Sequence, residues 1–151
     1  MIDIEKLYYT NKNKLNWKNV ERDLTKYLNC SFANENTSKT IIIDKIAVDE
    51  LTHSKYNMKL VGKLRLIKAN LCMHLESVIR EMENERWKED IGEKHKSIAK
   101  NGWFRYDIHF TYPIRDEMGN YIGKQNYKAT VVVRCAEDDK MYLYDIIDIK
   151  K

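Results

Sequence analysis

Polar side chains able to bind a phosphate alternate along three segments near the C-terminal end of the chain. Alternation places them on one side of a β-sheet, because successive side chains of a strand point to opposite faces. An arginine can contact a phosphate through two nitrogens, and a tyrosine ring can stack on a base. The pattern predicts a polar sheet face suited to a ribose-phosphate chain, formed by Arg105, Asp107, His109, Lys128, Thr130, Arg134, Tyr142 and Tyr144.

Metal-free cleavage of RNA needs two proton transfers, and two histidines are placed to supply them. One group takes the proton from the 2′-hydroxyl, another protonates the leaving 5′-oxygen, and cations stabilise the phosphorane. Histidine titrates near neutral pH and can serve in either role. His109 is on the predicted face, and His95 is in the basic segment before the first strand. By their chemistry they are equal candidates, with Thr130 orienting the phosphate.

The period of the apolar residues predicts the strands that carry this face. Three strands are expected, over 103–112, 127–135 and 141–149. Pro113 is expected to end the first of them. The opposite side of the strands should be covered, and by apolar content it holds Phe104, Tyr106, Ile108, Ala129, Val131, Val133, Leu143 and Ile147.

The hairpin loops, near 117–118 and 136–140, set the register of these strands. Arg134 should lie beside Tyr142, and Thr130 should lie within a residue or two of Asp145. Arg105 should lie close to Thr130. The predicted site therefore draws on all three strands.

Helical spacing dominates the residues before the strands. Apolar residues predict one helix over about 15–28 and another over about 64–85. Asp44 is expected to cap a short helix that ends near Leu51, and 29–40 should form a loop. These elements predict an α+β fold in which N-terminal helices pack on one face of a C-terminal antiparallel β-meander. A single domain is expected over 1–151, with 1–14 as a tether, 15–85 mainly helical and 103–149 as the sheet.

The charge of the chain is concentrated in its middle third. The whole sequence has 27 basic and 23 acidic side chains, and the excess falls within 52–106. A basic segment of this kind can attract a phosphate backbone, or it can be an ordinary solvated surface. If it binds RNA, the expected contacts are Lys59, Lys63, Arg65, Lys68 and Lys94, with Lys128 and Tyr142 on the sheet.

Composition also argues against several classes of protein. The three cysteines are scattered, which does not fit a disulfide framework or a zinc site. We therefore expect reduced thiols, no metal and no cofactor. No apolar run approaches the roughly 20 residues that span a bilayer, and the N-terminus lacks a secretion signal, so no membrane association is expected.

Several short motifs resemble a family of toxins from phages and mobile elements. The motifs are Lys94-His95, then the runs from Asn101 to Asp107, from Tyr127 to Arg134 and from Lys140 to Ile146. They are similar to C-terminal domains of MuF-type phage head proteins and large polyvalent proteins, and to tips of contact-dependent inhibition toxins. Those domains are grouped with the barnase–EndoU–colicin–RelE-like ribonucleases. The resemblance covers about 64–149.

The resemblance implies a metal-independent ribonuclease toxin, with tRNA as one candidate target. It favours His95 over His109 as the general acid/base. It also implies phosphate contacts from Arg105 and Arg134, and stacking or proton donation by Tyr144. A toxin of this kind would act in the cytoplasm of the producing cell or a target cell, delivered as part of a larger secreted or phage-borne protein. An acidic immunity protein or antitoxin would be its partner.

Two other functions fit the sequence. A non-catalytic RNA-binding module on the same fold would bind RNA in a salt-sensitive manner without cleaving it. A protein-interaction module would use the aromatic sheet face or the helix near 15–28, and ten tyrosines suit an interface.

Overall fold

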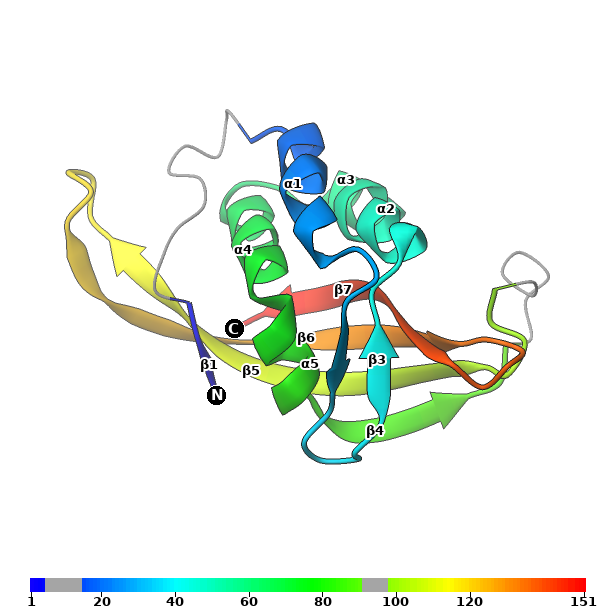
Figure 1. The fold of residues 1–151 in the computed structure, drawn as a ribbon. Helices are drawn as coiled ribbons and strands as arrows, with labels where there is room; N and C mark the ends of the chain where they lie inside the picture. The colour runs from blue at the N-terminus through cyan, green and yellow to red at the C-terminus, as the bar shows by residue number, and fades with distance from the viewer. Residues whose placement is uncertain (5–14, 91–97) are drawn as a thin grey trace.

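Three long antiparallel strands form the centre of the sheet. They are β5 (Trp103–Arg115), β6 (Tyr121–Cys135) and β7 (Met141–Lys150). The structure is a computed structural model that describes residues 1–4, 15–90 and 98–151. It is an α+β structure, as predicted, and the sheet curls beneath the helices (Figure 1).

Four short strands extend the meander at its two edges. β3 (Thr40–Ile42) pairs in parallel with β7, and β2 (Ser31–Ala33) pairs with β3. On the other side, β1 (Ile2–Asp3) and β4 (Glu83–Lys88) both pair with β5. Within the described residues the sheet has seven strands, in the order β1-β5-β6-β7-β3-β2 with β4 beside β5.

The helices precede the long strands in the chain and lie on one side of the sheet in Figure 1. Their bounds are α1 Trp17–Leu24, α2 Lys45–His53, α3 Lys55–Lys59, α4 Lys63–Leu71 and α5 Leu75–Glu81. Asp44 caps α2 as predicted, since its side chain accepts a hydrogen bond of 3.1 Å from the backbone N–H of Ala47.

Several predicted boundaries are wrong. The helix expected over 64–85 is divided by a 3₁₀ turn, Cys72–His74, and then gives way to β4. The apolar residues on both sides of the turn are buried in one core, so their spacing does not reveal the break. The expected loop at 29–40 contains β2, and the expected tether contains β1, while residues 5–14 lie outside the described part.

β5 also continues past Pro113, which pairs with Lys124 of β6. Neither β1 nor β4 pairs with this part of β5. The missing N–H of Pro113 therefore removes no hydrogen bond to a described strand on that edge of the sheet. Together with β6 it forms a ribbon that projects from the body of the sheet (Figure 1).

A bulge in β7 changes the side on which its residues face. Val132 is opposite Asp145 and Val133 is opposite Leu143, which leaves Tyr144 as the extra residue. Beyond the bulge Ile146 is fully buried and Ile147 is only half-buried. The prediction that Ile147 lies on the covered side is therefore wrong, because strict alternation does not hold across the bulge.

The covered side of the sheet packs into the apolar core. Tyr106 and Phe110 of β5 and Val131 and Val133 of β6 are fully buried, as the alternation predicted for three of these four. They belong to the same buried cluster as the apolar residues of the helices, which include Ile67, Leu71, Leu75, Val78 and Ile79. Burial of this side leaves the opposite side of β5 and β6 to carry the polar residues.

Candidate functional site

The polar side of β5, β6 and β7 is defined here as the open face. Arg105, His109 and Lys128 are exposed on it, and Asp107 and Thr130 are half-buried. The register places Asp107 opposite Thr130, and His109 opposite Lys128. Arg105 is opposite Val132, two residues along β6 from Thr130, which agrees with the predicted proximity of Arg105 and Thr130.

A row of three basic side chains crosses the open face. Lys128 is the partner of His109 on one side and of Lys150 on the other, and we call these three residues the cationic row. Like charges directly opposite each other on neighbouring strands destabilise a sheet. The side chains of Lys128 and Lys150 form no ion pair or hydrogen bond with any described residue. Repulsion between these charges therefore lowers the stability of the fold, whereas a bound anion would be attracted to them.

A shallow hollow of about 220 Å³ adjoins the cationic row. The hydroxyl of Thr130 can donate a hydrogen bond to an oxyanion held there. The residues that line the hollow are Asp107, His109, Lys128, Ala129, Thr130, Asp148 and Lys150. The two lysines and the hydroxyl can bind a phosphate group, while the carboxylates of Asp107 and Asp148 also line the hollow and reduce its positive charge.

Asp107 lies beside this hollow but is held by neighbouring groups. Its carboxylate accepts hydrogen bonds of 2.8 Å from Asn84 and 2.9 Å from Arg86, both of β4. Burial acts to raise the pKa of Asp107, but these two hydrogen bonds outweigh it and the pKa is lowered. Asp107 therefore stays ionised at neutral pH, where Arg86 is its main cationic partner and His109 also helps to lower its pKa.

His109 borders two hollows and has a carboxylate nearby. Its Nε2 lies 3.8 Å from Oε1 of Glu83, and half of its side chain is exposed. A second hollow of about 250 Å³ lies at the β4 side and is lined by Glu81, Glu83 and His109 among others. A carboxylate orients an imidazole for proton transfer by forming a hydrogen bond with it. Glu83 would have to move closer to His109 to form that bond.

Arg105 and Arg86 are cross-strand partners beside this region. Arg86 donates a hydrogen bond to Asp107, whereas the Arg105 side chain has no hydrogen bond or ion pair within the described residues. Arg105 and Asp107 are two residues apart on the same face, about 7 Å along the strand. The guanidinium of Arg105 can therefore reach an anion that lies over the hollow.

Arg134 is not exposed in the way the sequence predicted. Its pairing with Tyr142 is as expected, and its guanidinium lies 4.2 Å from the centre of that ring. However, the side chain is 6% exposed, donates to Asp44 and donates a 3.0 Å hydrogen bond to the carbonyl of Ile98. These contacts commit Arg134 to joining β6 to the start of α2. They do not place it as a phosphate ligand.

Tyr144 lies at the bulge and contacts an aromatic partner. Its ring packs edge-on against that of Trp103, with 4.8 Å between the ring centres. Burial, and then the nearby carboxylate of Glu50, raise the pKa of Tyr144 above its usual value. The phenol therefore stays protonated and donates its hydrogen bond to Glu50 of α2, so Tyr144 does not act as a base near neutral pH.

The basic residues expected to bind RNA do not form one surface. Lys59, Lys63 and Arg65 belong to α3 and α4, on the helical side of the sheet, whereas Lys128 is on the open face (Figure 1). His95 and Lys94 lie outside the described residues.

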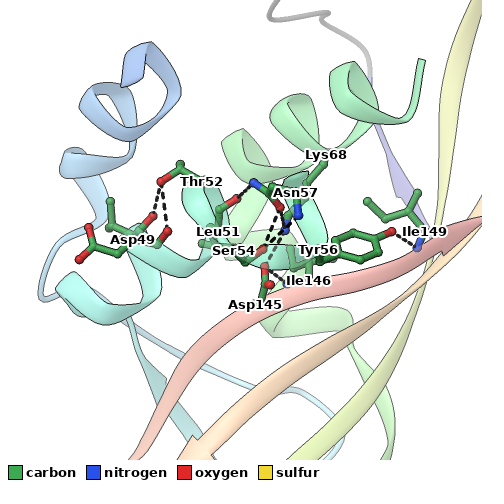
Figure 2. A network of polar contacts seen from close by, with 11 residues as sticks. Asp49, Leu51, Thr52, Ser54, Tyr56, Asn57, Lys68, Asp145, Ile146 and Ile149 are labelled. Carbon is green, nitrogen blue, oxygen red and sulfur yellow. Dashed lines mark hydrogen bonds and ion pairs between the residues drawn. The ribbon is translucent and has the colours of Figure 1, made fainter. Parts of the chain in front are cut away.

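The prediction that Lys68 binds RNA is wrong, because its side chain is fully buried. Figure 2 shows Lys68 of α4 pointing toward Asn57 of α3 and Asp145 of β7. Its ammonium group is 2.6 Å from the Asp145 carboxylate and also donates to the side chain of Asn57. Lys68 therefore ties two helices to the sheet. Burial raises the pKa of Asp145, and the ammonium of Lys68 partly opposes that shift.

Sequence reasoning missed Lys150 on the open face, and Glu83 and Arg86 of β4 beside it. Lys150 follows the end of the predicted third strand directly, so a strand one residue longer would have included it. Glu83 and Arg86 lie on β4, which the apolar period did not predict because five of its six residues are exposed. The residues of β4 do not show the alternation of apolar and polar side chains that predicted β5 and β6.

No family model matches the chain, and no curated protein matches its sequence. Among the described residues no helix is long and apolar enough to cross a membrane.

Proposed function

We propose that this protein is a metal-independent ribonuclease toxin domain whose RNA substrate lies across the open face. The observation that carries the proposal is the cationic row beside a hollow that also contains Thr130. Lys128 and Lys150 are like charges directly opposite each other that form no ion pair with any described residue, a cost to folding that phosphate binding would offset. Arg105 extends the same basic surface along β5.

The proposed reaction is a transesterification within the RNA. A base takes the proton of the 2′-hydroxyl, the 2′-oxygen attacks the phosphorus, and the bond from phosphorus to the 5′-oxygen breaks. The 5′-oxygen takes up a proton and the product ends in a 2′,3′-cyclic phosphate. His109 and His95 are the candidates for proton transfer, and Lys128, Lys150 and Arg105 would stabilise the negative charge of the phosphorane.

The arrangement of elements also supports the proposal. Helices precede an antiparallel meander and lie on one side of it, while the other side carries the polar residues. We propose on this basis that the fold is barnase–EndoU–colicin–RelE-like. In such a toxin the open face would be blocked in the producing cell by an acidic immunity protein or antitoxin. The substrate would be RNA in the cytoplasm, with tRNA as a candidate, and the domain would be delivered as part of a larger secreted or phage-borne protein.

The direct test is incubation of the purified protein with total tRNA in EDTA. We expect cleavage products that end in a 2′,3′-cyclic phosphate, and a smaller yield of them from Arg105→Ala. If the RNA stays intact but binds in a salt-sensitive manner, the protein is an RNA-binding module instead, because the cationic row needs only charge to hold a phosphate. If RNA neither binds nor breaks, both proposals fail.

Reversing one charge of the cationic row should affect stability and RNA binding in opposite directions. Lys150→Glu places a carboxylate opposite Lys128, so the free energy of unfolding should rise by about 0.2–1 kcal/mol. The same change should weaken RNA binding and reduce the salt dependence of that binding, by a slope of about one phosphate contact. Urea unfolding and salt-dependent fluorescence anisotropy measure the two effects.

The matched control for this prediction is Lys18→Glu, which changes the net charge equally on α1. It should leave the salt slope for RNA unchanged. Equal losses of RNA affinity in the two variants would mean that only net charge matters, and the cationic row would then have no special role.

A further inference from the structure

The corner formed by α3 and the start of α4 carries basic side chains without acidic neighbours in the sequence. Residues 52–75 contain no aspartate or glutamate. Lys68 in this segment is buried against Asp145, but Lys55, Lys59 and Lys63 are exposed and Arg65 is half-buried. In the described structure the side chains of these four residues make no ion pair or hydrogen bond. Within the described residues no carboxylate therefore pairs with their charges.

Two apolar side chains are exposed among these cations. Met58 is 82% exposed and Val61 is 75% exposed. Val61 lies in the turn between the helices, where Gly62 has a φ of +58° that an L side chain rarely adopts. Glycine permits this turn, in which the side chain of Val61 faces solvent. Neither side chain is part of the buried core, so both are accessible to a partner.

A hollow of about 480 Å³ is lined by Met58 of α3 and Trp17 of α1. Leu60 and Arg65 also line it. Methionine has a flexible side chain that adapts to different partners. The hollow, Met58 and Val61 thus provide an apolar centre, and Lys55, Lys59, Lys63 and Arg65 provide a charged rim. Protein interfaces commonly have this anatomy, with an apolar centre inside a polar rim.

We propose that this surface, which we call the α3–α4 corner, docks an acidic protein segment that inserts an apolar side chain into the hollow. The four cations, which form no ion pair with any residue the structure describes, specify the charge of the partner. The exposed apolar side chains of Met58 and Val61 favour a protein over RNA, and competition with RNA tests whether Trp17 of the hollow instead stacks on a base. The corner lies on the helical side of the sheet, so a partner bound here would leave the open face free (Figure 1). The inference does not rest on the proposed ribonuclease activity.

The test is fluorescence anisotropy with the full chain and a synthetic helical peptide that carries a leucine stripe on a glutamate-rich background. A peptide of the same charge without leucines is the matched probe. We expect the leucine-striped peptide to bind at least about tenfold more tightly, a difference of 1.4 kcal/mol. Met58→Ser with Val61→Ser should remove that advantage, and Lys59→Glu with Lys63→Glu should weaken both peptides.

Lys128→Glu on the open face should leave binding of the peptide unchanged, and thermal melts should show that every variant is folded. Three results would overturn the inference. The two peptides could bind equally, the corner variants could bind as the wild type does, or a single-stranded RNA could compete for the corner through the same residues with higher affinity. The last result would make the corner an RNA site.

Discussion

Replacing His109 by alanine is expected to slow RNA cleavage by about 10²- to 10⁴-fold, the usual contribution of a general acid or base. The expectation follows from the position of His109, which lies in the cationic row, borders the hollow with Thr130 and has Glu83 3.8 Å from its Nε2. Single-turnover cleavage of a labelled RNA, with enzyme in excess, measures the chemical step. Binding of an uncleavable RNA should change much less than the rate.

His53→Gln is the matched control, because His53 is an exposed histidine of α2 on the helical side that is paired with Glu21. It should cleave RNA at the wild-type rate. His95→Ala separates the two candidates. A large loss in His95→Ala with a normal rate in His109→Ala would assign the proton transfers to His95 and contradict this prediction.

Replacing Lys68 by alanine is expected to lower the free energy of unfolding by about 3–5 kcal/mol, the usual cost of removing one partner of a buried ion pair. The carboxylate of Asp145 would be left with 4% exposure and without its cation. The network in Figure 2 would also lose its link between α3, α4 and β7. Urea unfolding followed by circular dichroism measures the change.

Lys63→Ala is the control on the same helix, since Lys63 is exposed and unpaired among the described residues. Its effect should stay within about 0.5 kcal/mol. The double variant Lys68→Met with Asp145→Leu should recover most of the lost stability, because it removes both buried charges together. A loss below 1 kcal/mol in Lys68→Ala would mean that the pair contributes as little as a surface ion pair.

The strands that carry the site could be predicted because their signal is local. Residues 104–112 of β5 and 127–131 of β6 alternate between a covered side and a polar side, and short hairpin loops then fix the partners. The predicted neighbours Arg134 and Tyr142 are indeed directly opposite. Asp44 as the cap of α2 was also readable, since a cap depends only on the first turn of its own helix.

Features that depend on distant partners could not be read from the sequence. Lys68 has the spacing of a surface lysine on an amphipathic helix, and its partner Asp145 is 77 residues away. Arg134 likewise meets Asp44 across 90 residues. The bulge at Tyr144 arises from the pairing of β7 with β6. Strands β1 and β4 form by pairing with β5, and their own residues show no alternation that predicts a strand.

The candidate site changed for the same reasons. Lys68 and Arg134 were predicted to bind RNA, but both are buried and hold elements of the fold together. The register of β7 places Lys150 opposite Lys128. What remained from the sequence prediction is the group Arg105, Lys128 and Thr130 on one face, with His109 beside it. The candidate site therefore contains fewer of the predicted residues, and the structure adds the pairing of Lys128 with Lys150.

The central claim is that RNA lies on the open face, and the most direct measurement is a titration followed by the backbone amide signals of the protein in NMR. The ligand is a short 2′-O-methyl oligonucleotide, which cannot be cleaved through its 2′-oxygen. The largest shifts are predicted for β5 between Arg105 and His109, for Lys128 to Thr130 of β6 and for Lys150. Shifts confined to α3 and α4, or none at saturating oligonucleotide and low salt, would contradict the account.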